Sequence, residues 1–577
     1  MSLFPNIAQA HLRCVAIPCL GIASCLFGEL QAEQVELWTV DSMTRVSRTE
    51  PAAAGILSKE IRISAARNET EPFQVVVTAS TDALKNGSIE LKALVGPNGV
   101  QIGDHQIFYQ HYVNVVEPTE QSPYPPGEHP DPLVPVRENS PIFQPVTELP
   151  DAERLNQPFW IDVRIPDDAQ PGLYHGEFVF RAADVEESIP ILLTVWDFAL
   201  PKRPTLQTLF GMEGPRLAKN YDFELGTKRG NQILRAFEDC LADHQLTSEG
   251  FQGTLNVFDY DTERVSLHLE SQPLIGDAQD VYQHFLVDKG LSAVVIPMWP
   301  DWPYDDALGK DRRKAQRYIA DHVLQLRKRG WDSGVLGQCG YVDEPRSKKD
   351  YERVREWGQF YNEIEEQYGI KIPMFVTEQP QSENRKWGNL EGYVDVWVTH
   401  VADVWIDMHG DKTRKVAERR AAGDQIWFYT GLVTSPETWE KQNGNPEVLR
   451  EGNPPAWQID FPPMNHRVLT WMAPIYDVTG LLYWATIDFR DGIDPWKRAD
   501  NFILDGKYTY NGDGQFIYYG FEETVGFDGP IASLRLKWLR ESMEDHAYIS
   551  LLLEQGDREF AFSQINRIVR NVGDWDD

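Results

Sequence analysis

The sequence predicts an N-terminal β-sandwich followed by a (β/α)8 barrel of the TIM type, with a small C-terminal extension of one strand and two helices. Three observations predict this fold. The chain has 577 residues, whereas one domain usually has roughly 100–200. Its first third alternates apolar and polar residues at the period of strands. Beyond the proline-rich linker 199–204, strands alternate with amphipathic helices, the pattern of a parallel barrel.

These patterns divide the chain into four segments. We expect a signal peptide over residues 1–32, the sandwich over 33–200, the barrel over 205–514 and the extension over 515–577. In the first segment, Arg13 precedes the apolar run Cys14–Phe27, which is too short to span a membrane, and Ala32 is a plausible cleavage point. We therefore expect secretion or export to the periplasm. The alternative is a lipoprotein anchored at Cys25.

The sandwich is predicted from short strands separated by turn residues. Ile161, Val163 and Ile165 alternate with polar residues, and Pro171-Gly172 marks the following turn. A proline-rich loop is expected over Pro118–Pro150. Long loops of this kind are often functional. Three of its side chains, those of Tyr124, His129 and Asp131, either project toward a neighbouring domain or lie in solvent on a surface loop.

The barrel is predicted from eight candidate strands with helical patterns between several of them. The strands are Gln207–Met212, Thr247–Phe251, Ala293–Met298, Val335–Val342, Pro373–Thr377, Val394–Thr399, Ile426–Tyr429 and Gly480–Ile487. Apolar residues at helical spacing follow the third strand over 315–326 and the fourth over 351–368. The segment Val257–Leu269 is predicted to be an inserted hairpin. Beyond the barrel we expect a strand at Phe516–Tyr519 and a helix with Leu536, Leu539, Met543 and Ala547 on its apolar face.

Composition excludes several classes of partner. The formal charge of −33 argues against nucleic acid and anionic membranes. Of the five cysteines, only Cys240 and Cys339 lie outside the first segment, and no paired cysteine or histidine spacing suggests a metal site. We expect no cofactor and no metal. The oligomeric state stays open.

The candidate catalytic residues lie in Cys339–Pro345, where an apolar strand leads into Asp343 and Glu344. At the end of a barrel strand these carboxylates would lie on the catalytic face. Pro345 should hold Glu344 extended, and the backbone must twist or bulge for both acids to reach one pocket. The alternative is a helix start that places acids at the positive end of its dipole.

Other residues at the predicted strand ends are candidate substrate contacts. Carboxylates and aromatics dominate this set, which suits glycoside hydrolysis. Strand periodicity favours a core position for Trp484, and His400 is either a wall residue or a sugar contact. The candidates are Trp299, Trp302, Glu378, His400, Tyr429, Tyr483, Trp484 and Asp488.

Retaining glycosidases usually need an acid and a separate carboxylate nucleophile. Many barrel enzymes place the nucleophile at the end of strand seven, but Gln425–Gly431 contains no carboxylate. Either Glu378 supplies it, or a 2-acetamido substrate attacks its own anomeric carbon through the carbonyl oxygen. The second route needs one acid/base and one neighbouring carboxylate that stabilises the acetamido nitrogen, and an Asp-Glu pair meets this need.

The chain after residue 33 resembles glycoside hydrolase family 123 and its uncharacterised relatives. The resemblance rests on Arg67–Gln74, Ile165–Gly176, Tyr341–Pro345, His466–Trp484 and Ser533–Tyr548, in that order. It implies a sandwich followed by a catalytic barrel, and exo-acting β-N-acetylgalactosaminidase chemistry by substrate assistance. Asp343 would stabilise the acetamido group and Glu344 would be the acid/base.

The function expected is therefore hydrolysis of terminal 2-acetamido-2-deoxy-β-hexosides, with N-acetylgalactosamine preferred, on a glycan or glycoconjugate. Two alternatives stay open. One is a glycosidase for another sugar with Glu378 or Asp488 as nucleophile. The other is a non-catalytic glycan-binding surface protein that uses the same pocket.

Overall fold

The computed structural model describes residues 35–51, 58–137, 154–224, 227–249, 281–296, 298, 300, 303–340, 342–380, 387–401, 413–432, 454–490, 492–500, 502–504, 506 and 508–576. The expected signal peptide and the expected hairpin at Val257–Leu269 lie outside these residues. Within them, no helix is both long and apolar enough to cross a membrane.

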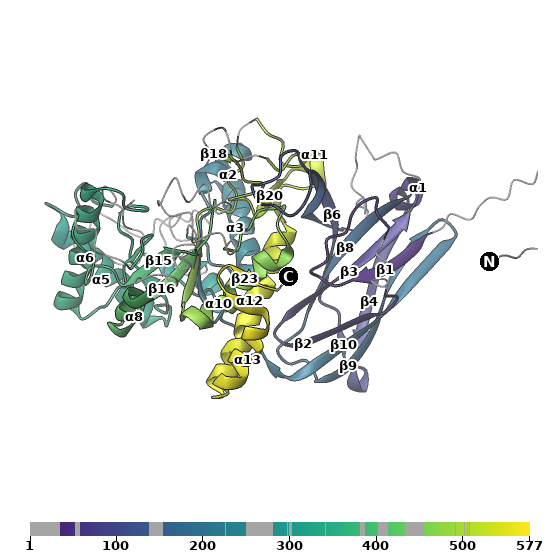
Figure 1. Ribbon diagram of the computed structural model, residues 1–577, viewed down its shortest axis with the longest axis horizontal. Coiled ribbons are helices and arrows are strands. Elements are labelled where there is room, and N and C mark those ends of the chain that lie inside the picture. The colour runs from purple at the N-terminus through teal and green to yellow at the C-terminus, as the bar shows by residue number, and fades with distance from the viewer. Residues whose placement is uncertain are drawn as a thin grey trace, which may run out of the picture.

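The N-terminal part contains two five-stranded sheets that face each other (Figure 1). The first sheet has the order β1 (Glu36–Val40), β3 (Thr70–Ala79), β8 (Leu155–Arg164), β6 (His105–Val115), β7 (Gly127–Pro135). The second has the order β2 (Ile61–Arg67), β10 (Val185–Ala199), β9 (Gly172–Ala182), β4 (Ser88–Val95), β5 (Gln101–Ile102). Their inner side chains share one core. The rings of Phe159 on β8 and Phe178 on β9 lie 6.2 Å apart within it.

The region expected to be a proline-rich loop contains strand β7, so this prediction is wrong for Gly127–Pro135. Asp131 on this strand is fully buried and accepts two hydrogen bonds of 2.9 Å from Arg535 and one of 2.7 Å from Tyr518. The contact joins the first sheet to the C-terminal part of the chain. Of the two alternatives for this residue, the projection toward a neighbouring domain is confirmed. Residues 138–150 of the expected loop lie outside the described residues.

The second part is built on a parallel sheet with the strand order β11 (Gln207–Phe210), β17 (Gly480–Tyr483), β16 (Gln425–Tyr429), β15 (Val396–His400), β14 (Phe375–Val376). A parallel pair, β12 (Val294–Val295) and β13 (Val335–Leu336), is joined to β14 by the single bridge Gly337–Met374. At the other edge, Ser248 makes a single parallel bridge to Phe210. The described residues thus form a half-barrel sheet with short additions, and the predicted closed ring of eight hydrogen-bonded strands is not established.

Several strands are shorter than predicted. The fourth strand, β13, ends at Leu336, and pairing continues by only one further bridge at Gly337 before Gly340 turns the chain at φ +64. A Cβ at Gly340 would lie 2.3 Å from Trp357 Nε1, so only glycine fits this turn. The shortening leaves residues 337–340 and 342–347 outside any strand or helix, between β13 and the next helix.

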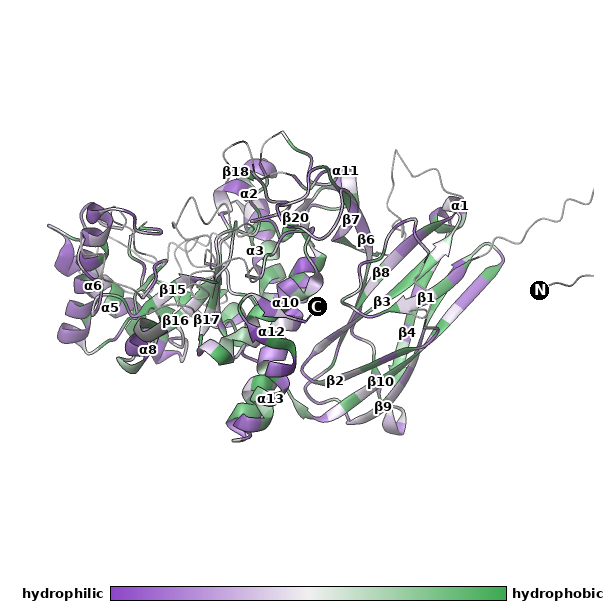
Figure 2. Ribbon diagram, in the orientation of Figure 1, coloured by the Kyte–Doolittle hydropathy of each residue, from purple (hydrophilic) through white to green (hydrophobic). Residues whose placement is uncertain are grey.

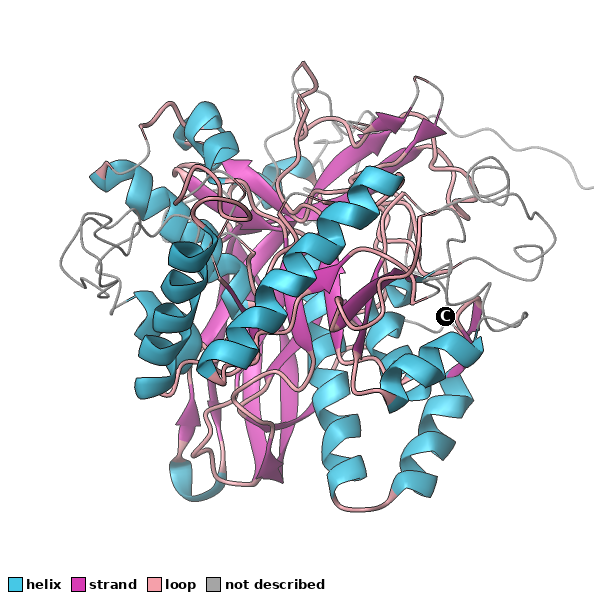
Figure 3. Cartoon of the chain, turned by 90° about the vertical axis from the view of Figure 1, so that its left-hand side faces the viewer, coloured by secondary structure: helices cyan, strands magenta, loops and turns pink. Residues whose placement is uncertain are grey.

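Helices surround these strands (Figure 3). They are α2 (Gly214–Asn220), α3 (Lys228–Asp243), α5 (Arg312–Lys328), α6 (Lys348–Tyr368), α8 (Thr413–Ala421) and α10 (Pro463–Tyr476). The apolar faces predicted over 315–326 and 351–368 are the buried faces of α5 and α6, except for Tyr368, which is 40% exposed. In Figure 2 the strands β16 and β17 are largely hydrophobic, whereas much of α6 is hydrophilic.

The described part of the C-terminal region contributes two antiparallel strand pairs and three helices, the first of which has only four residues. Its elements are β20 (Ile517–Gly520), α11 (Glu522–Val525), β21 (Gly529–Ala532), α12 (Leu534–Glu554), α13 (Arg558–Ile568), β22 (Val569–Asn571) and β23 (Asp574–Trp575). Smaller elements elsewhere are α1 (Thr81–Lys85), a 3-10 turn at Pro97–Gly99, a π-helical segment at Gln283–Asp288, β18 (Ile503–Leu504) and β19 (Tyr508–Thr509).

Helix α12 is buried on more than its predicted apolar face. Lys537 and Arg540 donate to the carboxylate of Asp162 on β8 over 2.7 Å and 2.9 Å, and the three side chains are at most 6% exposed. A buried carboxylate of this kind needs a paired cation, because an isolated charge would be costly to desolvate. The helix therefore connects the two parts of the chain through polar as well as apolar contacts.

Glu238 on α3 should make stability depend on pH. Burial raises the pKa of its carboxyl to about 8, although the Ser248 hydroxyl donates to Oε1 over 3.1 Å and opposes this shift. Between the ordinary pKa of 4.5 and about 8, the folded chain holds a proton that the unfolded chain has lost. Stability from this group therefore falls as pH rises through that window, by up to about 1.4 kcal/mol per pH unit.

Replacing Glu238 with glutamine should remove this contribution. We expect Glu238→Gln and the wild type to have similar midpoints of guanidinium denaturation at pH 5, and the variant to be the more resistant at pH 8. Denaturation curves at the two pH values provide the measurement. Parallel losses in both proteins between pH 5 and pH 8 would show that Glu238 does not titrate there.

Candidate active site

Asp343 and Glu344 lie in the loop between β13 and α6, at the carboxyl end of the fourth strand. The helix itself begins later. Ser347 is its N-cap, with a side-chain oxygen that accepts from the Asp350 amide over 3.2 Å. Since the cap role belongs to Ser347, the alternative in which the two acids start the helix is wrong. They are presented in the loop before it.

The backbone at Glu344 takes a left-handed conformation, with φ +41. The expectation that Pro345 holds this residue extended is therefore wrong. A positive φ is uncommon for a residue with a long side chain and costs about 1–3 kcal/mol. The surrounding contacts stabilise it, and the turn satisfies the requirement that the backbone twist at the strand end.

Thr377 connects the two acids. Its hydroxyl donates to Asp343 Oδ1 over 2.6 Å and accepts from the Glu344 amide over 2.8 Å. One side chain thus fixes the Asp343 carboxylate and the strained backbone of its neighbour. Thr377 was not among the sequence candidates, although its position at the end of the predicted strand Pro373–Thr377 was a usable signal.

The variant Thr377→Val should show whether the hydroxyl of Thr377, rather than the volume of its side chain, positions the two acids. Valine has nearly the shape of threonine but neither donates to Asp343 nor accepts from Glu344, so we expect kcat to fall about tenfold, as the loss of a hydrogen bond to a charged group implies. Thr377→Ser keeps the hydroxyl and should retain most of the activity. Equal rates for the valine and serine variants would remove Thr377 from the mechanism.

The Glu344 carboxylate has two side-chain partners. The Tyr429 hydroxyl donates to Oε1 over 2.6 Å, and Arg346 contacts Oε2. Tyr429 is the last residue of β16, the strand that lacks a carboxylate. The Arg346 side chain is 79% exposed, so water screens its pairing with Glu344. The sequence candidates Glu344 and Tyr429 are therefore brought together by the fold.

His400 is the last residue of β15, and its ring packs against the ring of Tyr429. The two rings are perpendicular with centroids 4.7 Å apart, and His400 Nε2 lies 3.2 Å from the carbonyl oxygen of Gly431. Burial lowers the pKa of His400 to about 4, which keeps the ring neutral at ordinary pH. Of the two alternatives for His400, the buried wall residue fits the structure.

Tyr483 was expected to contact substrate and Trp484 to lie in the core, but the structure buries Tyr483 and exposes Trp484. Tyr483 is 1% exposed and packs among core rings, so it offers no surface to a substrate. Trp484 is 39% exposed, contrary to the core position that periodicity favoured. Asp513 fixes Trp484 by accepting from its Nε1 over 2.7 Å. Sequence reasoning missed Asp513 because it lies beyond the last barrel strand.

The two candidate nucleophiles have different surroundings. Glu378 is half-buried and accepts from the Tyr351 hydroxyl over 3.2 Å, next to Thr377. Asp488 is buried, and its carboxylate pairs with Arg216 at 2.6 Å and with Arg490 at 3.8 Å. The pair with Arg216 holds Oδ1, whereas the contact of Oδ2 with Arg490 is too long for a hydrogen bond. A substrate contact or a nucleophilic role for Asp488 stays a prediction.

Glu249 is a further carboxyl of the site that the sequence candidates did not include. It follows Ser248 at the end of the second strand, where its amide donates to the Phe210 carbonyl over 2.9 Å. Burial, and then the charge of Asp343, raise the pKa of Glu249. The predicted contacts Trp299 and Trp302 lie outside the described residues. Among the residues that are described, no cluster of His, Cys, Asp and Glu could hold a metal ion.

Two segments of the chain match domains of one enzyme family. Residues 39–182 match the glycoside hydrolase 123 N-terminal domain, and residues 312–552 match the glycoside hydrolase 123 catalytic domain. The second match includes Asp343, Glu344, Thr377 and Tyr429. No curated protein matches the chain.

Solved structures add a likeness in fold. A family 123 glycoside hydrolase from Clostridium perfringens, described in a study of glycolipid glycan hydrolysis, superposes with a TM-score of 0.60 at 14% identity, over 92% of this chain and 90% of that one.

Two further likenesses are too remote to bear on the fold. A GH10 xylanase with a bacterial Ig-like domain, from termite gut, gives a TM-score of 0.28 at 9% identity (85% and 100% of the chains). A Parabacteroides merdae β-glucuronidase gives 0.25 at 10% identity (83% and 51%).

Proposed function

The chain belongs to glycoside hydrolase family 123 and is a glycoside hydrolase, and from this premise we propose that it removes terminal 2-acetamido-2-deoxy-β-hexosides, with N-acetylgalactosamine preferred. The observation that carries the proposal is the Asp343–Thr377–Glu344 arrangement, in which one hydroxyl holds two carboxyl-bearing residues side by side. A glycan of a glycolipid or another glycoconjugate is the proposed substrate, and the glycolipid glycan hydrolysis described for the Clostridium perfringens enzyme supports this class.

The proposed reaction proceeds in two steps. In the first, the acetamido carbonyl oxygen attacks the anomeric carbon, the glycosidic bond breaks, and Glu344 gives its proton to the leaving oxygen. Asp343 stabilises the positive charge that develops on the acetamido nitrogen. In the second, Glu344 takes a proton from a water molecule, and the oxygen of that water attacks the anomeric carbon. This attack opens the oxazolinium intermediate and gives the sugar in the β-configuration. The hydroxyl of Tyr429 orients Glu344 through both steps.

A panel of nitrophenyl β-glycosides tests the substrate class. The N-acetylgalactosaminide should be hydrolysed fastest, the N-acetylglucosaminide more slowly, and the galactoside and glucoside hardly at all, since they lack the attacking carbonyl. Equal rates on the galactoside and the N-acetylgalactosaminide would contradict substrate assistance. Inertness toward the whole panel would favour the non-catalytic glycan-binding alternative.

Glu378 is the nucleophile of the rival mechanism, because it is a half-buried carboxyl directly after Thr377. In that case a 2-deoxy-2-fluoro glycoside would form a covalent adduct on the protein. Under the proposal no adduct forms, and mass spectrometry of the treated protein distinguishes the two mechanisms.

The remaining expectations are also proposals. The strand order from Ser248 through β11, β17, β16, β15 and β14 to β13 and β12 supports a (β/α)8 ring, and the two facing N-terminal sheets support a β-sandwich. Export is supported by the apolar run Cys14–Phe27. The mature chain should then begin near Glu33, and mass spectrometry of the exported protein checks it. A lipid on Cys25 would replace this proposal.

A further inference from the structure

Asp513 is a fully buried side chain whose hydrogen bonds connect the segments that follow β16 and β17. Its Oδ1 accepts from Trp484 Nε1 over 2.7 Å and from the Tyr483 hydroxyl over 3.1 Å. Its Oδ2 accepts from the Leu432 amide over 3.0 Å and from Gln458 Nε2 over 2.5 Å. Burial raises the pKa of Asp513, and these hydrogen bonds oppose the shift. Four donors around one side chain suit a carboxylate, which only accepts.

Trp484 directly follows β17, at the edge of the sheet where Tyr429 ends β16. In the parallel pairing of these strands Tyr429 lies opposite Leu482, so Trp484 is two residues beyond the partner of Tyr429. The two segments stay close past the strand ends, since a Cβ at Gly431 would lie 3.3 Å from Trp484 Cδ1. Trp484 is 39% exposed. This places an exposed indole at the carboxyl ends of the parallel strands, where the ligand sites of such sheets form.

The backbone next to Asp513 lets the loop approach the indole closely. Gly512 and Gly514 both have left-handed conformations, at φ +75 and φ +74. A Cβ at Gly514 would lie 2.4 Å from Trp484 Cζ2, so any larger residue would collide with the ring. The ring of Phe502 meets the indole nearly at a right angle, with centroids 5.7 Å apart. These contacts, together with the hydrogen bond to Asp513, fix the orientation of the Trp484 side chain.

A fixed and partly exposed indole suits contact with the apolar face of a sugar ring. Small-molecule sites combine aromatic walls with a few placed polar groups, and tryptophan offers a large rigid surface together with an N–H that can anchor it. The polar groups of the candidate active site lie at the same end of the strands, where the Tyr429 hydroxyl donates to Glu344 over 2.6 Å. A wall of this kind is useful only when its own supports hold it in place.

We propose that Asp513 is a positioning residue of the hydrolase, which holds Trp484 as a wall of the sugar site and fixes this wall against the turn that follows Tyr429. The inference rests on the proposed function, because it places the sugar at the carboxyl ends of β16 and β17. The wall contacts the sugar in the bound substrate and in the transition state alike. Its displacement should therefore raise KM more than it lowers kcat.

Asp513→Asn tests the positioning role with little change in size. The indole N–H of Trp484 and the backbone N–H of Leu432 approach different oxygens of the carboxylate, and an amide must present its own hydrogens to one of them. We therefore expect KM to rise about tenfold, as the loss of a hydrogen bond to a charged group implies. Trp484→Phe, which removes the indole donor, should raise KM by about as much. The substrate is the nitrophenyl glycoside that the wild type hydrolyses fastest.

The double variant shows whether Asp513 acts through Trp484. With phenylalanine at position 484, the new amide can turn its hydrogens toward the ring and its oxygen toward the Leu432 amide. In the Trp484→Phe background, Asp513→Asn should therefore raise KM by only about threefold or less, because residues that share one hydrogen bond do not add independently. A double variant whose KM equals the product of the two single effects would overturn the proposal.

Asp460→Asn is the matched control for loss of a buried carboxylate. Asp460 is also fully buried, and it accepts from the Thr119 amide over 2.6 Å, from the Thr119 hydroxyl over 2.8 Å and from Asn511 Nδ2 over 3.0 Å. These partners lie outside the parallel sheet. Asp460→Asn should keep the wild-type KM even where its denaturation midpoint falls. A tenfold rise in its KM would show that Asp513→Asn reports only stability.

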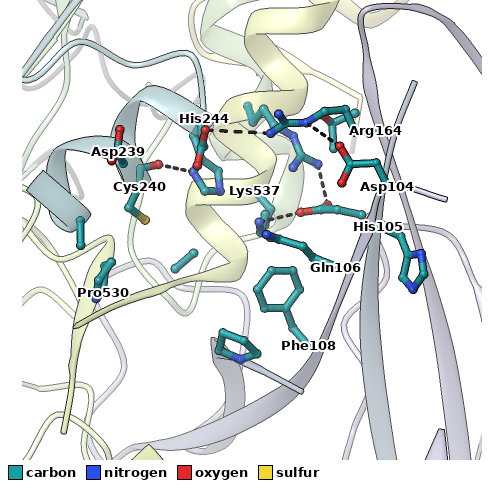
Figure 4. Close-up of a pocket in the computed structure, with 17 residues that line it drawn as sticks. Asp104, His105, Gln106, Phe108, Arg164, Asp239, Cys240, His244, Pro530 and Lys537 are labelled. Carbon is teal, nitrogen blue, oxygen red and sulfur yellow. Dashed lines mark hydrogen bonds and ion pairs between the residues drawn. The ribbon is translucent and has the colours of Figure 1, made fainter. Parts of the chain in front are cut away.

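Trp160→Phe is the matched control for the indole. Trp160 is buried, and its Nε1 donates to Asp162 over 2.8 Å, so the same kind of hydrogen bond is lost. Asp162 pairs with Lys537 beside the cavity between the first sheet and α12 (Figure 4), which no residue of the candidate active site lines. Trp160→Phe should therefore keep the wild-type KM, whereas an unchanged KM in Trp484→Phe would overturn the proposal.

Replacement of Trp484 with benzothienylalanine decides the case should Asp513→Asn fail to fold. This analogue has a sulfur atom in place of the N–H, so it keeps the area of the ring and removes only the donor to Asp513. We expect its KM to rise as well, and a wild-type KM would show that Asp513 does not position the ring. Inertness of the wild type toward the whole panel of nitrophenyl glycosides would remove the proposed function and this role together, whereas an active wild type with unchanged KM in the variants would remove this role alone.

Discussion

Replacing Glu344 with glutamine is expected to slow the hydrolysis of glycosides with poor leaving groups by about 10²–10⁴-fold, the usual contribution of general acid catalysis. The amide cannot give a proton to the leaving oxygen. Its carbonyl can still accept from the Tyr429 hydroxyl, which lies 2.6 Å from Oε1 in the wild type, so the local geometry should persist. Steady-state kinetics on a natural-type disaccharide and on an activated aryl glycoside provide the measurement.

The two substrates should respond differently to this variant. A nitrophenolate leaves without much protonation, so its first step should lose far less than that of the disaccharide. Glu352→Gln is a suitable control, since Glu352 is an exposed acid on α6 that pairs with Lys348 at 3.5 Å, and it should behave as the wild type. Small and equal losses on both substrates in Glu344→Gln would show that Glu344 is not the acid.

Replacing Asp343 with asparagine is expected to lower kcat by about 10²–10³-fold, the loss typical when one group that stabilises transition-state charge is removed. The neutral amide cannot offset the positive charge that develops on the acetamido nitrogen. Unlike Glu344→Gln, this variant should lose activity on the disaccharide and on the aryl glycoside alike, because both need the acetamido oxygen to attack. For each variant, the loss in kcat on the disaccharide is divided by the loss on the aryl glycoside. A large ratio for Glu344→Gln and a ratio near one for Asp343→Asn would show that Glu344 is the acid and Asp343 assists the acetamido group.

Folding should not account for the effect of Asp343→Asn. The Thr377 hydroxyl can still donate to the amide oxygen, and it can still accept from the Glu344 amide, 2.8 Å away in the wild type. We therefore expect the denaturation midpoint to stay close to that of the wild type. An Asp343→Asn variant that is fully active on the N-acetylgalactosaminide would contradict the assigned role.

The catalytic pair Asp343 and Glu344 was predictable because the two residues are adjacent in the sequence. An apolar run followed by adjacent carboxylates is visible in one stretch of sequence, and the family resemblance rests on the same residues. Thr377 and Tyr429 act on this pair across 34 and 85 positions, so their partners depend on strand order. Sequence placed both residues at strand ends, but it could not pair either of them with Asp343 or Glu344.

Orientation was the second limit on prediction. A period of two residues states that Tyr483 and Trp484 point to opposite sides of their strand, but it does not state which side is buried. The structure buries Tyr483 and exposes Trp484, which Asp513 holds from a later loop. The polar residues of α12 posed the same problem, because the partner of Lys537 is Asp162, 375 positions earlier.

The central claim is that the substrate's own acetamido group is the nucleophile, and calorimetric titration of the wild type with the thiazoline analogue of N-acetylgalactosamine tests it most directly. The thiazoline resembles the bicyclic intermediate, and analogues of high-energy states bind about 10²–10⁸-fold more tightly than ground-state ligands. We expect the wild type to bind the thiazoline at least about a hundredfold more tightly than free N-acetylgalactosamine, and Asp343→Asn to lose this preference. Equal affinity of the wild type for the two ligands would contradict it.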